Sequence, residues 1–187
     1  MAVYNTYSDS ANTAVRALLT KIGEYYLQRP FNTGSGKGKK DWEKIRDIYF
    51  NGKCSYCERG ELKLQIEHLI MFNRTEYGLH HPGNIAPVCN DCNKRRKNKN
   101  KNYLDWQGQL KQICKERNEL DFFETRKKKI LYHINESEYK YPTLSEAEKH
   151  SIRVIANSLY ENIKTESEKS LNLYKELDKA FVNNNKL

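Results

Sequence analysis

Four of the five cysteines stand in two pairs, with two residues between the thiols of each pair. The pairs are Cys54 with Cys57 and Cys89 with Cys92. Two intervening residues let a tight turn direct both sulfurs at one tetrahedral ion, and Gly52 and Gly60 suit such a turn beside the first pair. The pattern predicts a structural zinc ion held by four thiolates, with redox dithiols or buried thiols as the alternative interpretation. Cys114 stands alone on a helical pattern and is interpreted as a small core residue.

A zinc ion with four protein ligands has no open position for water, so any chemistry must come from other side chains. Four candidates lie between and just after the cysteine pairs: Glu67, His68, Asn84 and Asn93. A histidine can deprotonate water near neutral pH, while carboxylate and amide oxygens suit a hard divalent ion such as Mg²⁺ or Mn²⁺. The hydrolysis of a phosphodiester needs an activated water and charge stabilisation on the phosphoryl oxygens, which this combination can supply.

Taken in order, these residues resemble the HNH endonuclease family over about residues 53–97. The matching segments are Cys54-Ser55-Tyr56-Cys57, Ile66-Glu67-His68-Leu69, Pro82-Gly83-Asn84-Ile85-Ala86-Pro87-Val88-Cys89 and Cys92-Asn93-Lys94. The resemblance implies a ββα-metal nuclease core with a zinc ribbon. It implies that His68 is the general base and that Asn84 braces the loop orienting it. It also implies that Glu67 and Asn93 hold a single magnesium or manganese ion.

The chain departs from the commonest family pattern at two positions. Glu67 stands where an aspartate is usual, and Asn93 stands where a histidine is usual. The extra methylene of glutamate places the ion about one bond farther from the backbone. For His68 taken alone, a structural histidine is the alternative interpretation. His80 and His81 could also approach phosphate or metal, but the proline that follows them favours a role in a turn.

The charge of the chain favours an anionic partner. It carries 33 Lys and Arg residues against 24 Asp and Glu, a formal net charge of +9. Residues 37–101 contain 15 basic and 8 acidic side chains, so most of the excess lies in the segment that holds the cysteines. Such a balance predicts binding to DNA, without excluding RNA. The expected phosphate contacts follow Asn93 directly: Lys94, Arg95, Arg96, Lys97, Lys99 and Lys101. Arg126-Lys127-Lys128-Lys129 forms a second basic cluster.

An α+β fold is expected to position these side chains. Alternating apolar residues predict one strand over 62–66, and the apolar run at 84–88 predicts a second. A helix capped by Asn90 or Asp91 and running through Lys97 would complete a ββα unit.

Helices are predicted on both sides of this core. On the N-terminal side they comprise residues 10–28 and a short helix capped by Asp41, with a flexible basic loop over 32–40 between them. On the C-terminal side they comprise residues 103–116, 119–134 and an apolar stripe from Ser145 to Phe181. At roughly 55 Å this last helix would exceed a small domain, so it is expected to break near Ser167, pack back or meet a partner.

Three regions are predicted from these patterns. They are an N-terminal helical region with a basic Gly/Lys loop (1–52), the nuclease core with its zinc ribbon (53–101) and a C-terminal helical region (102–187). No run of about 20 apolar residues and no secretory signal is visible, so the chain is expected in the cytoplasm without a membrane partner. Segment 142–187 is nearly neutral in charge and is expected to mediate self-association or docking to another protein.

The sequence therefore predicts a metal-dependent HNH endonuclease that hydrolyses DNA in restriction or phage defence. Two alternatives stay open. One is a zinc-ribbon module that binds nucleic acid without catalysis. The other is a nuclease subunit that acts only inside a larger complex.

Overall fold

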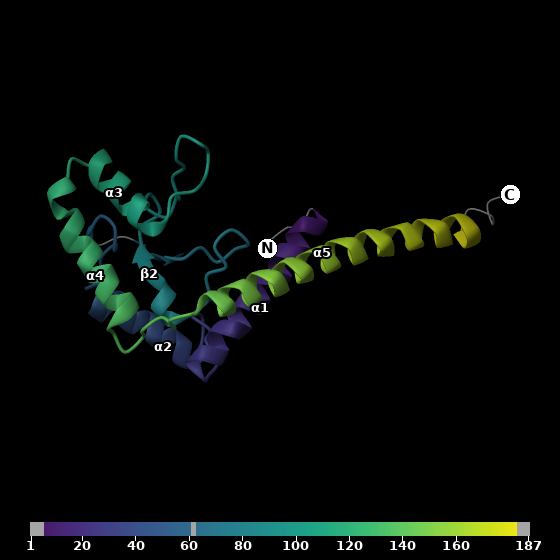
Figure 1. Cartoon of the computed structure of the whole chain (residues 1–187), viewed down its shortest axis with the longest axis horizontal. Coiled ribbons are helices and arrows are strands. Elements are labelled where there is room, and N and C mark those ends of the chain that lie inside the picture. The colour runs from purple at the N-terminus through teal and green to yellow at the C-terminus, as the bar shows by residue number, and fades with distance from the viewer. Residues whose placement is uncertain (1–5, 61–62, 183–187) are drawn as a thin grey trace.

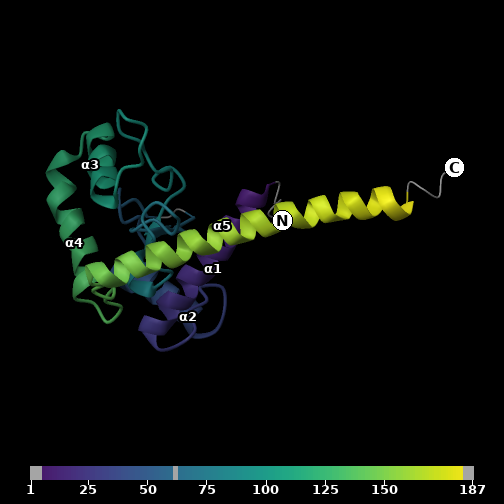
Figure 2. The same cartoon turned by 45° about the vertical axis from the view of Figure 1, so that its right-hand side comes forward.

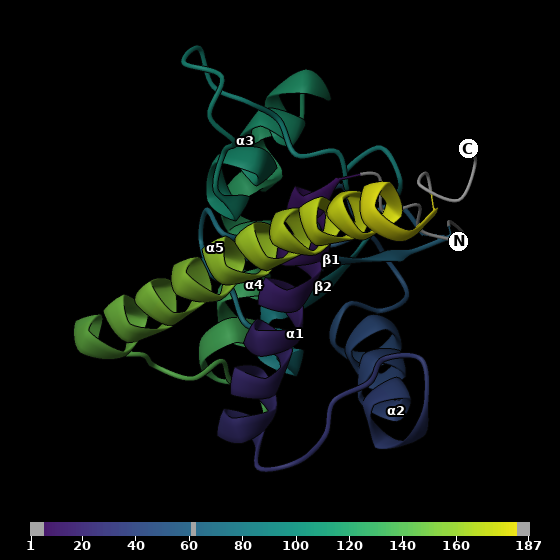
Figure 3. The same cartoon turned by 90° about the vertical axis from the view of Figure 1, so that its right-hand side faces the viewer.

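The computed structural model describes residues 6–60 and 63–182, in which helices surround one small sheet (Figure 1). In chain order, its helices and strands are α1 (Tyr7–Leu27), α2 (Gly36–Lys44), β1 (Gln65–His68), β2 (Ile85–Val88), α3 (Trp106–Glu116), α4 (Phe123–Asn135) and α5 (Glu146–Leu177). The α+β class is confirmed. Figures 1 and 3 place α2 and α3 at opposite ends of the body. Among the described residues, no helix combines the length and the apolar character that a membrane span requires.

The two strands pair antiparallel, with Gln65 opposite Val88 and His68 opposite Ile85. Every residue of β2 is buried, whereas β1 buries Glu67 and leaves its other residues partly exposed. β1 begins later than predicted, and Leu62 of the predicted strand lies outside the described residues. Because the strands are antiparallel neighbours, the loop of residues 69–84 leaves and re-enters the sheet beside His68.

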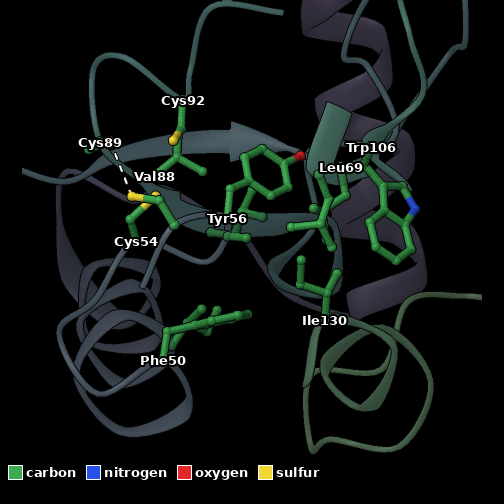
Figure 4. Packing of buried hydrophobic residues seen from close by; sticks show 14 of the residues in the cluster. Phe50, Cys54, Tyr56, Leu69, Val88, Cys89, Cys92, Trp106 and Ile130 are labelled. Carbon is green, nitrogen blue, oxygen red and sulfur yellow. Dashed lines mark hydrogen bonds between the residues drawn. The ribbon is translucent and has the colours of Figure 1, made fainter. Parts of the chain in front are cut away.

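Two apolar cores hold the fold together. The first surrounds the sheet and includes the cysteine pairs, Phe50, Tyr56, Leu69, Trp106 and Ile130 (Figure 4). The second lies between α1 and α5 and includes Val15, Leu19, Leu79, Ile152 and Tyr160. Leu79 belongs to the loop between the strands, so the second core anchors that loop to the two long helices.

The two long helices begin with capping boxes, which satisfy amide groups that a helix leaves unpaired. Thr6 and Asp9 form the box of α1, and Ser145 and Glu148 form that of α5, which confirms the predicted start at Ser145. The Tyr26 hydroxyl donates a 2.7 Å hydrogen bond to Glu148. This bond joins the end of α1 to the beginning of α5, so the helices pack antiparallel.

Of the three outcomes expected for the last helix, the break near Ser167 is wrong. α5 continues through this residue for 32 residues in all, and Ser167 Oγ donates a 2.7 Å hydrogen bond to the carbonyl of Ile163 within the helix. Ile152 and Tyr160 are buried against α1, but the part of α5 after Ile163 extends beyond α1 and away from the body (Figures 1 and 2). Its first half therefore packs within the chain, and its second half is solvated.

The predicted helix over residues 90–97 is also wrong, because these residues form turns and an extended loop. Gln109 of α3 explains the difference. Its buried side chain donates 3.0 Å hydrogen bonds to the carbonyls of Cys92 and Lys94 and accepts a 2.8 Å bond from the amide of Arg96. Two of these groups, the carbonyl of Cys92 and the amide of Arg96, would pair with each other in a helix. The strands are thus followed by a loop, and α3 is the next helix.

The basic segment 32–40 is only partly a loop, because α2 begins at Gly36 after the extended residue Ser35. Gly38 is required within this helix, since a Cβ there would lie 2.5 Å from the carbonyl oxygen of Asn32. The prediction that Asp41 caps a helix is wrong. This residue lies inside α2, where its buried carboxylate forms a 2.7 Å ion pair with Arg29.

Candidate active site

The four paired cysteines converge on one point at the edge of the first core. Their sulfur atoms all lie within 4.8 Å of one another, and all four residues are buried. Zn–S bonds of about 2.3 Å in a tetrahedron place sulfurs about 3.8 Å apart. The Cys57 and Cys89 sulfurs are 3.9 Å apart, so this donor set fits a zinc ion.

Short turns deliver the first cysteine pair. The amide of Cys54 donates to the carbonyl of Arg59 at 3.0 Å, and the amide of Ser55 donates to Pro87 of β2 at 2.7 Å. Gly52 adopts a φ of 64°, which favours glycine and agrees with the turn role predicted for it. Cys114 is fully buried in the first core, as predicted.

His68 lies at the end of β1 beside a pocket of about 340 Å³. The pocket is lined by Arg16, Ile66, Glu67, His68, Met71, Phe72, Asn73 and Arg95. The ring of Phe72 stacks on the ring of His68 with centroids 4.8 Å apart. Burial, together with the nearby His80 and Arg16, holds the pKa of His68 well below its usual value. The imidazole is therefore neutral at pH 7, as a proton acceptor must be.

Asn84 ties together the two ends of the loop that follows His68. Its Oδ1 accepts a 2.8 Å hydrogen bond from the amide of Ile70. Its Nδ2 donates 2.9 Å bonds to the carbonyls of Ile70 and Leu79. Because Asn84 is itself buried, these bonds fix the path of the loop beside His68.

Glu67 is ion-paired with Arg95, and both side chains are nearly buried. Arg95 also donates a 2.9 Å hydrogen bond to the carbonyl of His68 and a 3.2 Å bond to that of Leu104. Burial raises the pKa of Glu67 to about 7, against the lowering effect of Arg95. A divalent ion bound to Glu67 would therefore compete with this guanidinium.

The structure places Asn93 beside Gln65 of β1, whereas the other predicted metal ligand is Glu67 of the same strand. Asn93 Nδ2 donates a 2.7 Å hydrogen bond to Gln65 Oε1. Gln65 and Glu67 are two residues apart on a strand, so they share one face at a spacing of about 7 Å. Asn93 and Glu67 therefore contact different partners in the structure, Gln65 and Arg95 respectively.

The predicted phosphate-binding residues fall into two groups. Arg95 is engaged with Glu67, and Arg96 forms a 2.7 Å ion pair with Glu116. The lysines of the set are all exposed: Lys94, Lys97, Lys99 and Lys101. In the second basic cluster Arg126 is buried and pairs with Glu119 at 2.7 Å. The lysines therefore offer the more accessible charge.

Two residues near the site, Arg16 and Gln109, escaped the sequence reasoning. Arg16 reaches the pocket from α1, and Gln109 holds the basic loop from α3. His80 lies within hydrogen-bonding distance of His68, whereas His81 takes the predicted turn role by accepting a 3.0 Å bond from the amide of Gly83. The adjacent histidines were the one sequence signal for these contacts. Arg16 and Gln109 carried none.

No protein-family model and no solved structure matches the chain. A curated protein of Bacillus subtilis (strain 168), named "SPbeta prophage-derived putative HNH endonuclease YoqL", is 32% identical to it over 88 residues. The alignment covers 41% of this chain and 36% of the relative, so the chain spans about a third of that protein's length. Over part of its length, the chain is thus similar to a protein named for the HNH endonucleases, and it carries a four-cysteine cluster that fits zinc.

Proposed function

We propose that this protein is a metal-dependent HNH endonuclease that hydrolyses phosphodiester bonds of DNA. The observation that carries the proposal is the placement of His68. Its neutral imidazole lines a pocket, and Asn84 fixes the path of the loop that follows His68. Two arginines, Arg16 and Arg95, line the same pocket. A base beside guanidinium groups suits attack on a phosphate, because cations stabilise the charge that develops on its oxygens.

In the proposed reaction, Nδ1 of His68 takes a proton from the attacking water. The water oxygen bonds to phosphorus, and the bond from phosphorus to the 3′ oxygen breaks, so that the 3′ oxygen leaves with the electron pair and takes up a proton from solvent. Arg16 is exposed and would orient the phosphate from the side of α1. Glu67 and Asn93 would hold the magnesium or manganese ion, with Arg95 released from the Glu67 carboxylate. When bound, that ion supplies further charge neutralisation at the phosphoryl oxygens.

The exposed lysines that follow Asn93 would bind the DNA backbone without reading its sequence. Restriction or phage defence is the proposed setting, and RNA is the alternative substrate for the same chemistry. A non-catalytic zinc module is the second candidate function. It is favoured by the pairing of Glu67 with Arg95, because the guanidinium occupies the carboxylate that would bind the divalent ion.

A cleavage assay separates these candidates. Purified protein is incubated with plasmid DNA, phage DNA or RNA in magnesium, manganese or chelator, and the cut ends are mapped. We expect metal-dependent cleavage that falls by about 10²–10⁴-fold in His68→Ala, while DNA binding stays within a few-fold. The exposed His150→Ala variant is the matched control and should cleave normally. Cleavage by His68→Ala at the wild-type rate would remove His68 from the mechanism.

A further inference from the structure

The imidazole of His68 is in contact with a second histidine. Nε2 of His68 and Nδ1 of His80 lie 2.9 Å apart, and the ring centroids are 5.2 Å apart. We propose that His80 is a positioning residue that accepts a hydrogen bond from Nε2–H of His68. This bond holds His68 in the tautomer whose Nδ1 carries a lone pair. The proposal rests on the proposed nuclease function, in which that lone pair takes the proton from water.

The charges in the pocket favour His68 as the donor of this hydrogen bond. A bond between two neutral imidazoles needs one protonated nitrogen and one lone pair. Since His80 engages Nε2 of His68, Nδ1 is the ring nitrogen left for the pocket. There the positive charge of Arg16 acts on the imidazole, whereas that of Arg95 is paired with Glu67. Nearby guanidinium groups stabilise a lone pair and destabilise an N–H dipole pointing toward them. The proton of His68 is therefore better placed on Nε2.

The negative charge of Glu24 on α1 favours the same arrangement through its effect on His80. Burial lowers the pKa of His80, and the Glu24 carboxylate opposes this effect by favouring a proton on the ring. With Nδ1 facing His68, the proton belongs on Nε2 of His80, which leaves Nδ1 as an acceptor. Glu24 is itself held in place, because its carboxylate accepts a 3.0 Å hydrogen bond from the amide of Phe31 and a 2.7 Å bond from Lys21.

The packing around His80 leaves it little freedom to turn away. The buried ring of Phe31 lies 4.9 Å from the ring of His80, centroid to centroid. α1 passes so close that a Cβ on Gly23 would lie 2.3 Å from the carbonyl oxygen of His80. The preceding residue, Leu79, is buried in the second core. α1 and the following loop thus hold His80 from outside the region of family resemblance.

Two substitutions separate hydrogen bonding from packing. His80→Phe keeps an aromatic ring against Phe31 but provides no acceptor. His80→Asn places an amide oxygen near the position of Nδ1. Steady-state cleavage gives kcat and KM, and ¹⁵N NMR of the His68 imidazole reports which ring nitrogen is protonated. His150→Phe makes the same change at an exposed site and is the matched control.

For the wild type we expect a protonated Nε2 and a lone pair on Nδ1 of His68. In His80→Phe we expect a mixture of tautomers, a kcat lowered by about 10–100-fold and a KM within about twofold of wild type. His80→Asn should restore the single tautomer and part of kcat. Failure of this rescue, with the two variants equally impaired and the tautomer unchanged in both, would assign His80 to packing alone.

A wild-type His68 protonated on Nδ1 would also overturn the positioning role. The NMR readout does not depend on cleavage, so the two proposals can fail separately. A protein that shows the expected tautomer but cuts neither DNA nor RNA with any metal would keep the hydrogen bond and overturn the nuclease function.

Discussion

Arg95 shows how much the surroundings of one residue decide its role. In the sequence it is one of six basic side chains expected to contact phosphate. In the structure its guanidinium is nearly buried against Glu67 and the carbonyl of His68. A buried charge must be paired, because removing one partner leaves the other uncompensated.

We therefore expect Arg95→Ala to destabilise the protein by about 3–5 kcal/mol, as is typical when a buried pair is broken. Lys99→Ala, at an exposed position of the same segment, should change stability by less than about 0.5 kcal/mol and weaken DNA binding instead. Urea unfolding of both variants checks the difference. Equal stability of the two variants would show that Arg95 belongs with the phosphate-binding lysines.

At this scale, the sequence could predict the contacts of residues whose partners lie close in the chain or are of the same residue type. The two cysteine pairs converge as predicted because identical ligands at a fixed spacing have few other uses. The contact between His68 and His80 was out of reach, because His80 lies in a loop whose path depends on Asn84 and on Leu79 in the second core.

At the scale of elements, local signals gave correct predictions and long-range bonds overrode others. The Ser145 cap lies within the segment that it starts, so its pattern was visible. Residues 90–97 have caps and helix formers, but Gln109 comes from another helix and takes their backbone groups. Pattern reasoning has no access to such a partner.

Gln109→Ala should therefore loosen the basic loop. The substitution leaves the carbonyls of Cys92 and Lys94 and the amide of Arg96 without their partner, and we expect a loss of about 2–3 kcal/mol. Amide exchange in residues 92–96 should also accelerate. Gln107→Ala, two residues away at a partly exposed position of α3, is the control. Unchanged exchange in Gln109→Ala would mean that other contacts hold the loop.

For the whole molecule, buried histidines predict acid sensitivity. Burial lowers the pKa of His81 to about 4 and also lowers the pKa of His133, whose Nε2 faces the carbonyls of Pro82 and Ile85. The unfolded chain takes up these protons near pH 6.5 and the folded chain only at lower pH. The contribution of these two histidines to the free energy of unfolding should thus be complete above pH 6.5 and decrease toward pH 4. Urea midpoints at pH 7.5, 6 and 5 test this, and a flat profile would contradict it.

The solvated half of α5 carries the prediction about assembly. Residues 164–177 contain three basic and three acidic side chains, so this segment is neutral in a chain of net charge +9. Leu171, Leu173, Tyr174 and Leu177 are between 41% and 65% exposed. A neutral helix with exposed apolar side chains suits pairing with a copy of itself better than contact with DNA.

We expect the full chain to dimerise through this segment and a chain ending after Ile163 to be monomeric, as measured by light scattering at micromolar concentration. The truncation keeps the residues that pack on α1, so its thermal unfolding should stay cooperative. Replacing Leu171 and Tyr174 with Lys in the full chain should have the same effect. A full-length protein that is monomeric at these concentrations would contradict the role of α5 in dimerisation.

The packing of α1 against α5 has a consequence for the timing of synthesis. The cysteine pairs and the His68 loop are translated well before residues 146–163, which form the other side of the second core. Until those residues leave the ribosome, α1 lacks the surface that buries Val15 and Leu19. Without this packing, α1 lacks the contacts that fix its position against His80. A nascent chain would therefore carry His68 and His80 before the second core can align them.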